Sequence, residues 1–337
     1  MLAPRLAMTG KSYVSPQDVR CVAVIGTGAV GANWAALFLA RGMSVVAYDR
    51  ADGAEERARN LISAAWPALH ALGLATSDTP PLQNFRFAGS PAEAARAADV
   101  VQENVPEQPM LKAGILEELD AAASPDKIIL SSTGGIPPTQ LQAHCRAPQR
   151  LVVMHPFNPS HLIPLVEVVG GELTSEAVIE WAMGFAKYLG KQPIRIRAEA
   201  TGHLTNRLQF ALVREAVACL LDGMASPADI DSAVRYGLGP RWTLMGPLLT
   251  LHLAGGAGGM KGILDHAGNA IQEWWTPRTD VNITPALKQR LAEAASELSH
   301  GAPIGEWEAW RDRHLVELLQ LQTTSRALEP RDKQVNP

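Results

Sequence analysis

The stretch from Val22 to Asp49, VAVIGTGAVGANWAALFLARGMSVVAYD, decides the fold of this chain. It opens with an apolar run at 22–25, which is typical of a buried parallel strand. A glycine-rich turn follows, and apolar residues then recur at helical spacing as far as Leu39. A second apolar run at 44–48 predicts another strand, which ends at Asp49. Strand, glycine turn, helix, strand and acidic residue follow one another in the order that a dinucleotide site requires.

The turn between the first strand and the helix reads GTGAVG. Gly26 permits a tight bend, Gly28 lets the backbone approach a pyrophosphate, and Gly31 lets the helix pack close to the strand. The N-terminus of the helix offers unpaired N–H groups and the positive end of its dipole to the phosphates. We therefore expect a dinucleotide to contact Gly26, Thr27, Gly28, Ala29, Val30 and Gly31.

Asp49 indicates which dinucleotide binds. A carboxylate at this position, about 20 residues beyond the turn, accepts hydrogen bonds from a ribose 2′-hydroxyl. A 2′-phosphate would meet like charge there, so NAD is favoured over NADP as the cofactor. The neighbouring Arg50 is a second candidate cofactor residue, because an arginine at this point accommodates a 2′-phosphate.

The composition excludes several classes of function. The 337 residues are 47% hydrophobic and 19% charged, which suits a globular protein of two domains. The net charge is −4 and no long basic run occurs, so we expect neither a nucleic-acid partner nor a membrane. No apolar run has transmembrane length, and the first residues lack a secretory apolar core, so we expect a cytoplasmic protein.

The cysteines and histidines give no metal-ligand spacing. Cys21, Cys145 and Cys219 lie far apart, which favours small buried apolar side chains over a disulfide framework or a cysteine metal site. No His, Asp or Glu spacing suggests a ligand set either, so we expect no metal.

Strand and helix patterns alternate through the first 200 residues. The predicted strands lie at 22–25, 44–48, 85–88, 99–103, 127–131, 151–154, 162–169 and 193–196. The predicted helices between them lie at 54–74, 91–98, 109–123 and 175–189, and only helical patterns follow, among them 206–221 and 227–234. This order predicts an α/β fold, with an N-terminal Rossmann-type, doubly wound, mostly parallel sheet followed by an all-α C-terminal domain. We expect a flexible extension at 1–17, the NAD domain at 18–200, the helical domain at 201–325 and a tail at 326–337.

A bound dinucleotide implies hydride transfer, and oxidation of an alcohol needs a base for the hydroxyl proton. His155 is the best candidate, because it is placed just past the predicted strand at 151–154, where open α/β sheets bind their ligands. Prolines follow it in HPFNP, and an imidazole titrates near neutral pH. Spacing alone leaves a structural role for it open. The other candidate histidines, for which we expect surface or capping positions, are His144, His161, His203 and His252.

Two further polar residues, Glu167 and Asn206, are candidates for the same site as His155. Glu167 interrupts an apolar run, LVEVV, and a buried carboxylate needs a partner such as a histidine that it would orient. The alternative is an edge strand on which Glu167 faces solvent. Asn206 opens the helical part, where its amide either hydrogen-bonds a substrate oxygen or caps the helix.

Taken together, these segments resemble the 3-hydroxyacyl-CoA dehydrogenase family over roughly residues 20 to 260. The resemblance rests on GTGAVG with Asp49, VQENVPE at 101–107, HPFNP at 155–159 with LVEVVGG at 165–171, and TGHLTNRL at 201–208. It implies that His155 is the catalytic base, Glu167 its partner and Asn206 the third catalytic residue. It also implies a homodimer through the helical domain, and it places three residues on the cofactor side: Glu103, Glu107 and Lys112.

The resemblance is closer to one branch, that of lambda-crystallin, L-gulonate 3-dehydrogenase and L-carnitine dehydrogenase. HPFNPSHLIPLVEVVGG and GLGPRWTLMGPLLTLHLAGG carry this likeness, at 155–171 and 237–256. Members of this branch act on small free 3-hydroxy acids, and we expect an oxidoreductase that interconverts a 3-hydroxy acid or a 3-hydroxyacyl compound with its 3-oxo form. A ketoreductase of bulkier β-keto compounds and a non-catalytic, crystallin-like NAD-binding protein are the alternatives. Trp242, Trp274 and Trp275 either pack in the core and dimer interface or line a cation-binding pocket.

One position departs from the family pattern. The family usually has a serine after Ser-Ser-Thr or Ser-Asn-Thr, and that serine hydrogen-bonds the substrate hydroxyl, whereas this chain has Gly134 in its place. Loss of such a bond costs about 0.5–1.5 kcal/mol, so catalysis would weaken without vanishing. Either Gly134 makes room for a bulkier substrate, or Ser132 or Thr133 takes over the contact. These three residues are the candidate substrate-binding residues.

Overall fold

A computed structural model describes residues 13–275 and 279–326. The chain divides into two compact units, one up to Arg207 and one from Leu208, and helix α7 (Thr205–Leu221) begins in the first and continues in the second. Of the predicted extension at 1–17, residues 1–12 lie outside the described part, as do 327–337 of the predicted tail. Tyr13 and Val14 pack against the core of the first unit, so this end of the extension is held in place.

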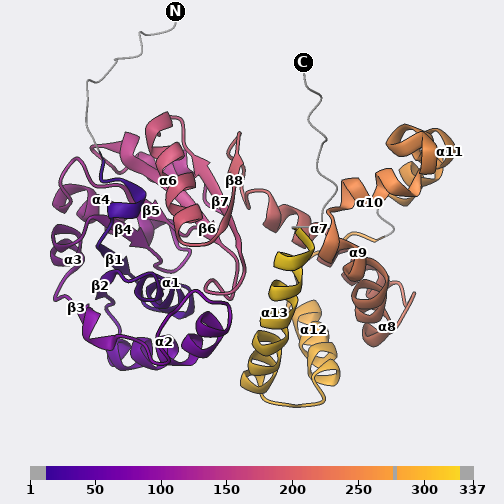
Figure 1. The fold of residues 1–337 in the computed structure, drawn as a ribbon. Coiled ribbons are helices and arrows are strands. Elements are labelled where there is room, and N and C mark those ends of the chain that lie inside the picture. The colour runs from indigo at the N-terminus through magenta and orange to yellow at the C-terminus, as the bar shows by residue number, and fades with distance from the viewer. Residues whose placement is uncertain (1–12, 276–278, 327–337) are drawn as a thin grey trace, which may run out of the picture. The chain divides into compact units, whose positions relative to one another are not determined.

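The first unit contains one sheet of eight strands, in the order β3-β2-β1-β4-β5-β6-β7-β8 (Figure 1). Neighbouring strands are parallel except for β6 and β7, which pair antiparallel. The predicted Rossmann-type, mostly parallel sheet is therefore confirmed. The strands are β1 (Cys21–Ile25), β2 (Ser44–Tyr48), β3 (Phe85–Phe87), β4 (Val100–Glu103), β5 (Ile129–Ser131), β6 (Leu151–Pro156), β7 (Leu165–Gly170) and β8 (Gln192–Ile196).

Helices cover both faces of this sheet, which explains why its strands are continuously apolar (Figure 1). Alternate side chains of β1 enter two separate cores: Val24 packs with Trp34 and Phe185, whereas Ile25 packs with Leu116. The first core lies under α1 (Ala29–Ala40), α2 (Ala54–Ala71) and α6 (Glu176–Tyr188). The second lies under α3 (Pro91–Ala97), α4 (Pro109–Ala122) and α5 (Pro138–Gln142).

Several predicted boundaries are wrong, among them those of the strands predicted at 127–131 and 162–169, which begin at Ile129 and Leu165. Strand β6 runs on to Pro156, so His155 lies within the strand instead of just past its end. The pairing of β6 with β7 continues beyond the part that pairs with β5, and this extends the strand. Helix α2 ends at Ala71 instead of residue 74, and the pattern at 227–234 divides into α8 (Pro227–Ser232) and a π-helix, η4 (Ala233–Leu238).

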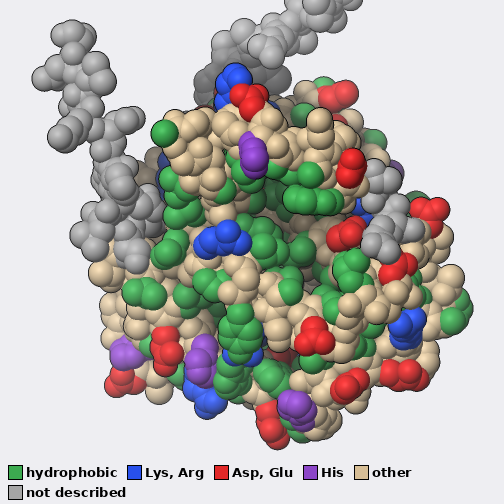
Figure 2. Space-filling view, turned by 90° about the vertical axis from the view of Figure 1, so that its right-hand side faces the viewer, with side chains coloured by type: hydrophobic (Ala, Val, Ile, Leu, Met, Phe, Trp, Pro, Cys, Tyr) green, Lys and Arg blue, Asp and Glu red, His purple; other side chains and the backbone are tan. Residues whose placement is uncertain are grey.

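The second unit is helical and buries little apolar surface within the described chain. Its buried hydrophobic residues are Val217, Ala218 and Leu287. Trp274 and Trp275 are 70% and 69% exposed, so the expected core packing of these tryptophans is wrong for the single chain. Hydrophobic side chains gather in patches on the face shown in Figure 2. After α8 and η4 come α9 (Gly239–Leu244), α10 (Pro247–Ala254), α11 (Gly259–Trp274), α12 (Pro285–Leu298) and α13 (Ile304–Arg326).

Two expectations from composition can be examined along the described residues. No helix there is long and apolar enough to cross a membrane. The three cysteines are free, and each is half-buried instead of fully buried.

Candidate active site

The antiparallel pairing of β6 and β7 places His155 directly opposite Glu167. The Nδ1 atom of His155 lies 2.9 Å from Oε2 of Glu167, and the carboxylate is fully buried. Burial acts to raise the pKa of Glu167, but hydrogen bonds from His155 and Thr205 outweigh it and lower the pKa below its usual value. The alternative of a solvent-facing Glu167 on an edge strand is wrong, because β7 lies between β6 and β8.

The second oxygen of Glu167 connects the strand to the start of α7. Its Oε1 atom accepts hydrogen bonds from the N–H groups of Leu204 (3.1 Å) and Thr205 (2.8 Å) and from the Thr205 hydroxyl (3.1 Å). A carboxylate at a helix N-terminus satisfies otherwise unpaired N–H groups and favours the helix dipole. One carboxylate therefore fixes both the imidazole and the helix that carries Asn206.

Asn206 is the second residue of α7, so the alternative of a capping role is wrong. Its Nδ2 atom donates a hydrogen bond of 2.9 Å to the carbonyl oxygen of Gly134. A Cβ atom added to Gly134 would lie 2.9 Å from Nε2 of His155 and 3.3 Å from Nδ2 of Asn206. Hence the imidazole and the amide both lie against the bare α-carbon of Gly134, closer than a side chain there would permit.

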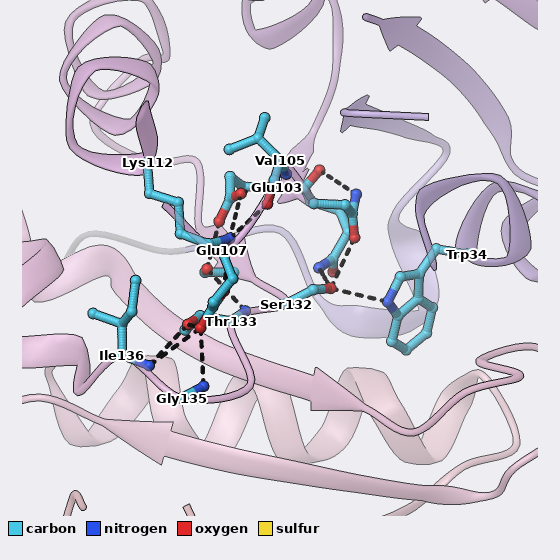
Figure 3. A network of polar contacts seen from close by, with 12 residues as sticks. Trp34, Glu103, Val105, Glu107, Lys112, Ser132, Thr133, Gly135 and Ile136 are labelled. Carbon is cyan, nitrogen blue, oxygen red and sulfur yellow. Dashed lines mark hydrogen bonds and ion pairs between the residues drawn. The ribbon is translucent and has the colours of Figure 1, made fainter. Parts of the chain in front are cut away.

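Glu107 holds the loop that carries Gly134 (Figure 3). Its Oε1 atom accepts hydrogen bonds from the Thr133 hydroxyl (2.5 Å) and from the N–H groups of Gly135 (3.0 Å) and Ile136 (3.3 Å). Burial tends to raise the pKa of Glu107, but the Thr133 hydrogen bond and the charge of Lys112 outweigh it and lower the pKa. The loop is thus fixed by a carboxylate on one side and by Asn206 on the other.

The hydroxyls of Ser132 and Thr133 are both engaged inside the protein. Thr133 donates to Glu107, as described above. Ser132 Oγ accepts from Nε1 of Trp34 (3.2 Å) and Nε2 of Gln102 (2.9 Å), and it donates to Oδ1 of Asn104 (2.8 Å). In this arrangement neither hydroxyl replaces the serine that the family has at position 134.

Glu103 and Lys112 form a buried ion pair beneath the same loop (Figure 3). Lys112 Nζ lies 2.8 Å from Oε1 of Glu103, and both side chains are at most 1% exposed. Glu103 also accepts from the Ser131 hydroxyl (2.5 Å). Of the three predicted cofactor-side residues, Glu107 is the one whose side chain reaches the surface, with 45% exposed.

The glycine turn has the features that a dinucleotide needs. Gly26 has φ +85°, and a Cβ on Gly31 would lie 1.9 Å from the Gly26 carbonyl oxygen, so both positions require glycine. A Cβ on Gly28 would meet no atom within 4 Å, so the turn is open where the backbone would meet a pyrophosphate. Ala29 and Val30 follow as the first residues of α1.

Asp49 lies beside this turn at the end of β2. Its Oδ2 atom accepts hydrogen bonds from the N–H (2.7 Å) and hydroxyl (3.2 Å) of Thr27, and its Oδ1 atom accepts from the Ala51 N–H (3.0 Å). The carboxylate is therefore held at the turn, as an adenosine-ribose acceptor would be. Arg50 is exposed next to it.

His203, for which we expected a surface or capping position, lies inside the site. It is 1% exposed, has φ +47°, and its ring centroid lies 5.5 Å from that of His155. Its Nε2 atom lies 3.1 Å from the Thr133 carbonyl oxygen. Burial and the nearby His155 lower the pKa of His203. The expected surface position is correct for His144 and His252, which are exposed, but wrong for His203 and for the buried His161.

Comparison with known proteins identifies the family. The family description "3-hydroxyacyl-CoA dehydrogenase, NAD binding domain" matches residues 21–200, and its C-terminal domain matches 202–298. L-carnitine dehydrogenase of Nocardiopsis dassonvillei is 43% identical over 322 residues, which cover 96% of this chain and 95% of that protein. L-carnitine dehydrogenase of Streptomyces griseus is 44% identical over 306 residues, 91% of each chain.

A solved structure extends the same comparison. The structure of 5-formyl-3-hydroxy-2-methylpyridine 4-carboxylic acid 5-dehydrogenase, described as an NAD⁺-dependent dismutase, is 33% identical, with a TM-score of 0.78. The match covers 93% of this chain and 100% of that one. The predicted NAD cofactor is confirmed by the NAD-binding domain match. This chain therefore belongs to the 3-hydroxyacyl-CoA dehydrogenase family and is an NAD-dependent dehydrogenase.

Proposed function

We propose that this enzyme oxidises a small free 3-hydroxy acid to its 3-oxo form, with His155 as the general base. The observation that carries the proposal is the hydrogen bond between Nδ1 of His155 and the buried Glu167 carboxylate. With its proton on Nδ1, the imidazole has an unprotonated Nε2 that is able to accept the substrate hydroxyl proton. NAD, when bound, supplies the acceptor for the hydride that leaves the same carbon.

Glu167 has two roles in this proposal. It selects the tautomer that leaves Nε2 free, and it stabilises the imidazolium that forms when His155 takes the proton. Hydrogen bonds with His155 and Thr205 lower the pKa of Glu167 and so favour the ionised carboxylate while it is buried. The charge needed opposite the imidazolium is therefore present before the reaction begins.

Asn206 and the loop at 132–136 would hold the substrate. The Asn206 amide lies beside Nε2 of His155 across the α-carbon of Gly134, so both side chains face the same small region. An amide there orients a hydroxyl or carbonyl oxygen toward the base. Glu107 fixes the loop, which keeps this region rigid.

The residues of the glycine turn would hold NAD. Gly28 leaves room for the pyrophosphate at the N-terminus of α1, and Asp49 is held where it would accept the ribose hydroxyls. We propose that Thr27, Ala29 and Val30 also contact NAD, and that Arg50 and Glu107 lie at the edge of the NAD site.

The two L-carnitine dehydrogenases favour a 3-hydroxy acid that carries a quaternary ammonium group. A second candidate is reduction of a bulkier β-keto compound, because this chain has Gly134 where the family has a serine, but the imidazole and the Asn206 amide take up the space beside its α-carbon. We also propose that two chains form a homodimer through the helical unit, and that the free cysteines reflect a cytoplasmic location.

The test is nicotinamide absorbance with NAD and a panel of alcohols. The panel contains L-carnitine, L-gulonate, 3-hydroxybutyrate, a 3-hydroxyacyl-CoA and a bulky aromatic 3-hydroxy ester, and NADP is run in parallel. We expect turnover with a small free acid and NAD. Turnover of the bulky ester alone would support the ketoreductase, and NADH binding without turnover of any alcohol in the panel would contradict both.

A further inference from the structure

Lys191 is a buried lysine that the proposed chemistry does not use. It lies between α6 and β8 and is 4% exposed. Burial lowers its pKa to about 7, and within the described chain no carboxylate pairs with it to offset that burial. A charged side chain without such a partner is costly inside a protein, so its position calls for an explanation.

The amino group of Lys191 is surrounded by carbonyl oxygens of a single loop. Nζ lies 2.7 Å from the oxygen of Ser160, 2.9 Å from that of Ile163 and 3.4 Å from that of His161. An ammonium group has three N–H donors, so the three carbonyls match it in number. The loop that they belong to joins β6 to β7, the two strands that carry His155 and Glu167.

The same loop is attached to the dinucleotide helix. The Ser160 hydroxyl donates a hydrogen bond of 3.2 Å to the carbonyl oxygen of Val30, in the first turn of α1. Nζ of Lys191 also lies 5.8 Å from the ring centroid of Trp34, which is on α1 as well and whose indole donates to Ser132. At the other end of the loop, Phe157 packs its ring against His155, with centroids 4.7 Å apart.

We propose that Lys191 is a positioning residue, which holds the β6–β7 loop in the one geometry that connects the His155 imidazole to the first turn of α1. The inference rests on the proposed function, because it takes His155 as the base. The loop then sets two distances at once, that of Phe157 from the imidazole and that of Ser160 from the helix N-terminus. A shift of this loop would impair proton transfer and NAD binding together.

The experiment compares Lys191→Ala with Lys187→Ala, an exposed lysine on the preceding helix. NADH affinity is measured by fluorescence titration, and kcat and KM are measured with the substrate found above. We expect Lys191→Ala to lower kcat about ten- to a hundred-fold, the range that a misplacement of about 1 Å causes. NADH affinity should fall as well, and Lys187→Ala should match the wild type.

Chemical rescue separates positioning from folding. n-Propylammonium has the chain length that Lys191→Ala removes, so we expect it to restore kcat in a saturable manner. Tetramethylammonium at equal ionic strength has no N–H donor and should restore nothing. A folded Lys191→Ala variant with unchanged kcat and NADH affinity would overturn the proposal, and so would a loss of kcat that propylammonium fails to reverse.

Ser160→Ala provides the second test if Lys191→Ala does not fold. It keeps the lysine but removes the hydrogen bond to Val30, so NADH affinity should fall while the fold remains. Unchanged affinity would overturn the proposed link to α1. If the wild type oxidises no alcohol, the proposed function fails. The NADH affinity of Lys191→Ala, compared with that of the wild type, then still tests whether Lys191 positions the loop. If the wild type oxidises a 3-hydroxy acid and the Lys191 and Ser160 variants behave like it, the inference about Lys191 fails and the proposed function stands.

Discussion

Gly134 determines how closely the side chains of His155 and Asn206 approach the loop at 132–136. A Cβ at this position would lie 2.9 Å from Nε2 of His155, and the ring is unable to retreat freely because Glu167 holds its other nitrogen. We therefore expect Gly134→Ser to lower kcat about ten- to a hundred-fold, although it restores the serine usual in the family. Steady-state kinetics of the purified variant measure this.

Gly135→Ala is the matched control for this substitution. A Cβ on Gly135 would lie 3.6 Å from Glu107 and 3.9 Å from Gly202, which are ordinary contacts. We expect this variant to keep kcat within about two-fold of the wild type, a change of less than 0.5 kcal/mol. A rise of kcat in Gly134→Ser would contradict the account, because it would mean that the imidazole moves easily and lacks only a hydroxyl.

His203 makes the stability of the fold depend on pH. Burial and His155 lower its pKa, and its ordinary value is 6.5. As the pH falls below 6.5, the unfolded chain binds this proton first, so folding stability falls until the pH passes the lowered pKa of the folded state. We expect acidification through this window to destabilise the wild type more than His203→Gln, as measured by urea unfolding. Equal losses in the two proteins would contradict this.

The residues of the site were predictable to different degrees. His155, Glu167 and Asn206 could be selected from the sequence because each is a polar residue in an ordered set of motifs. The burial of His203 could not, since it depends on a left-handed backbone and on a carbonyl 70 residues away in the chain. Lys191 gave no local signal either, because its partners belong to a loop that only the sheet order brings near.

At the scale of an element, substitutions in the glycine turn separate an effect on the stability of the fold from an effect on NADH binding. A Cβ on Gly31 would clash with the Gly26 carbonyl, whereas a Cβ on Gly28 would meet nothing within 4 Å. We expect Gly31→Ala to be strongly destabilised, by overpacking of about 1–3 kcal/mol or more. Gly28→Ala should keep wild-type stability and lose NADH affinity, because the new methyl group projects where the pyrophosphate would approach.

Thermal unfolding and NADH titration of the two variants check this difference. Tight NADH binding by Gly28→Ala would contradict the placement of the pyrophosphate.

The end of strand β6 could not be predicted from its own sequence. Its apolar run predicts the strand as far as Met154, but the last two residues pair only with β7, so the extension depends on a neighbouring strand.

At the scale of the whole molecule, the described part of the helical unit exposes many large apolar side chains. Helix α10 alone exposes three leucines, Leu248 by 75%, Leu249 by 50% and Leu253 by 57%. Large exposed apolar patches mark interaction surfaces. We expect sedimentation equilibrium to give twice the 36.1 kDa mass of the chain.

A charge on this surface should weaken the dimer. Leu248→Lys with Leu253→Lys should shift the protein toward the monomer, whereas Leu173→Lys, at an equally exposed leucine of the first unit, should not. A wild-type protein that remains monomeric at micromolar concentration would contradict the proposed homodimer.

The fold class could be predicted for the whole chain, because alternating strand and helix patterns admit few topologies. The core on both faces of the sheet follows from that alternation, whereas the strand order and the antiparallel pairing of β6 with β7 come from the structure. The helical unit was less predictable. For Trp274 and Trp275 we expected packing in the core and dimer interface or a cation-binding pocket, and the structure shows that they are exposed in the single chain, because apolar composition does not reveal which chain covers a side chain.

We propose that His155, held by Glu167, removes the substrate proton. The most direct measurement is kcat of NAD reduction for His155→Asn and Glu167→Gln beside the wild type, with NADH affinity measured on the same samples. We expect NADH affinity to be retained and kcat to fall about 10²- to 10⁴-fold in His155→Asn, the range for loss of a general base. Near-normal kcat in His155→Asn would contradict the account.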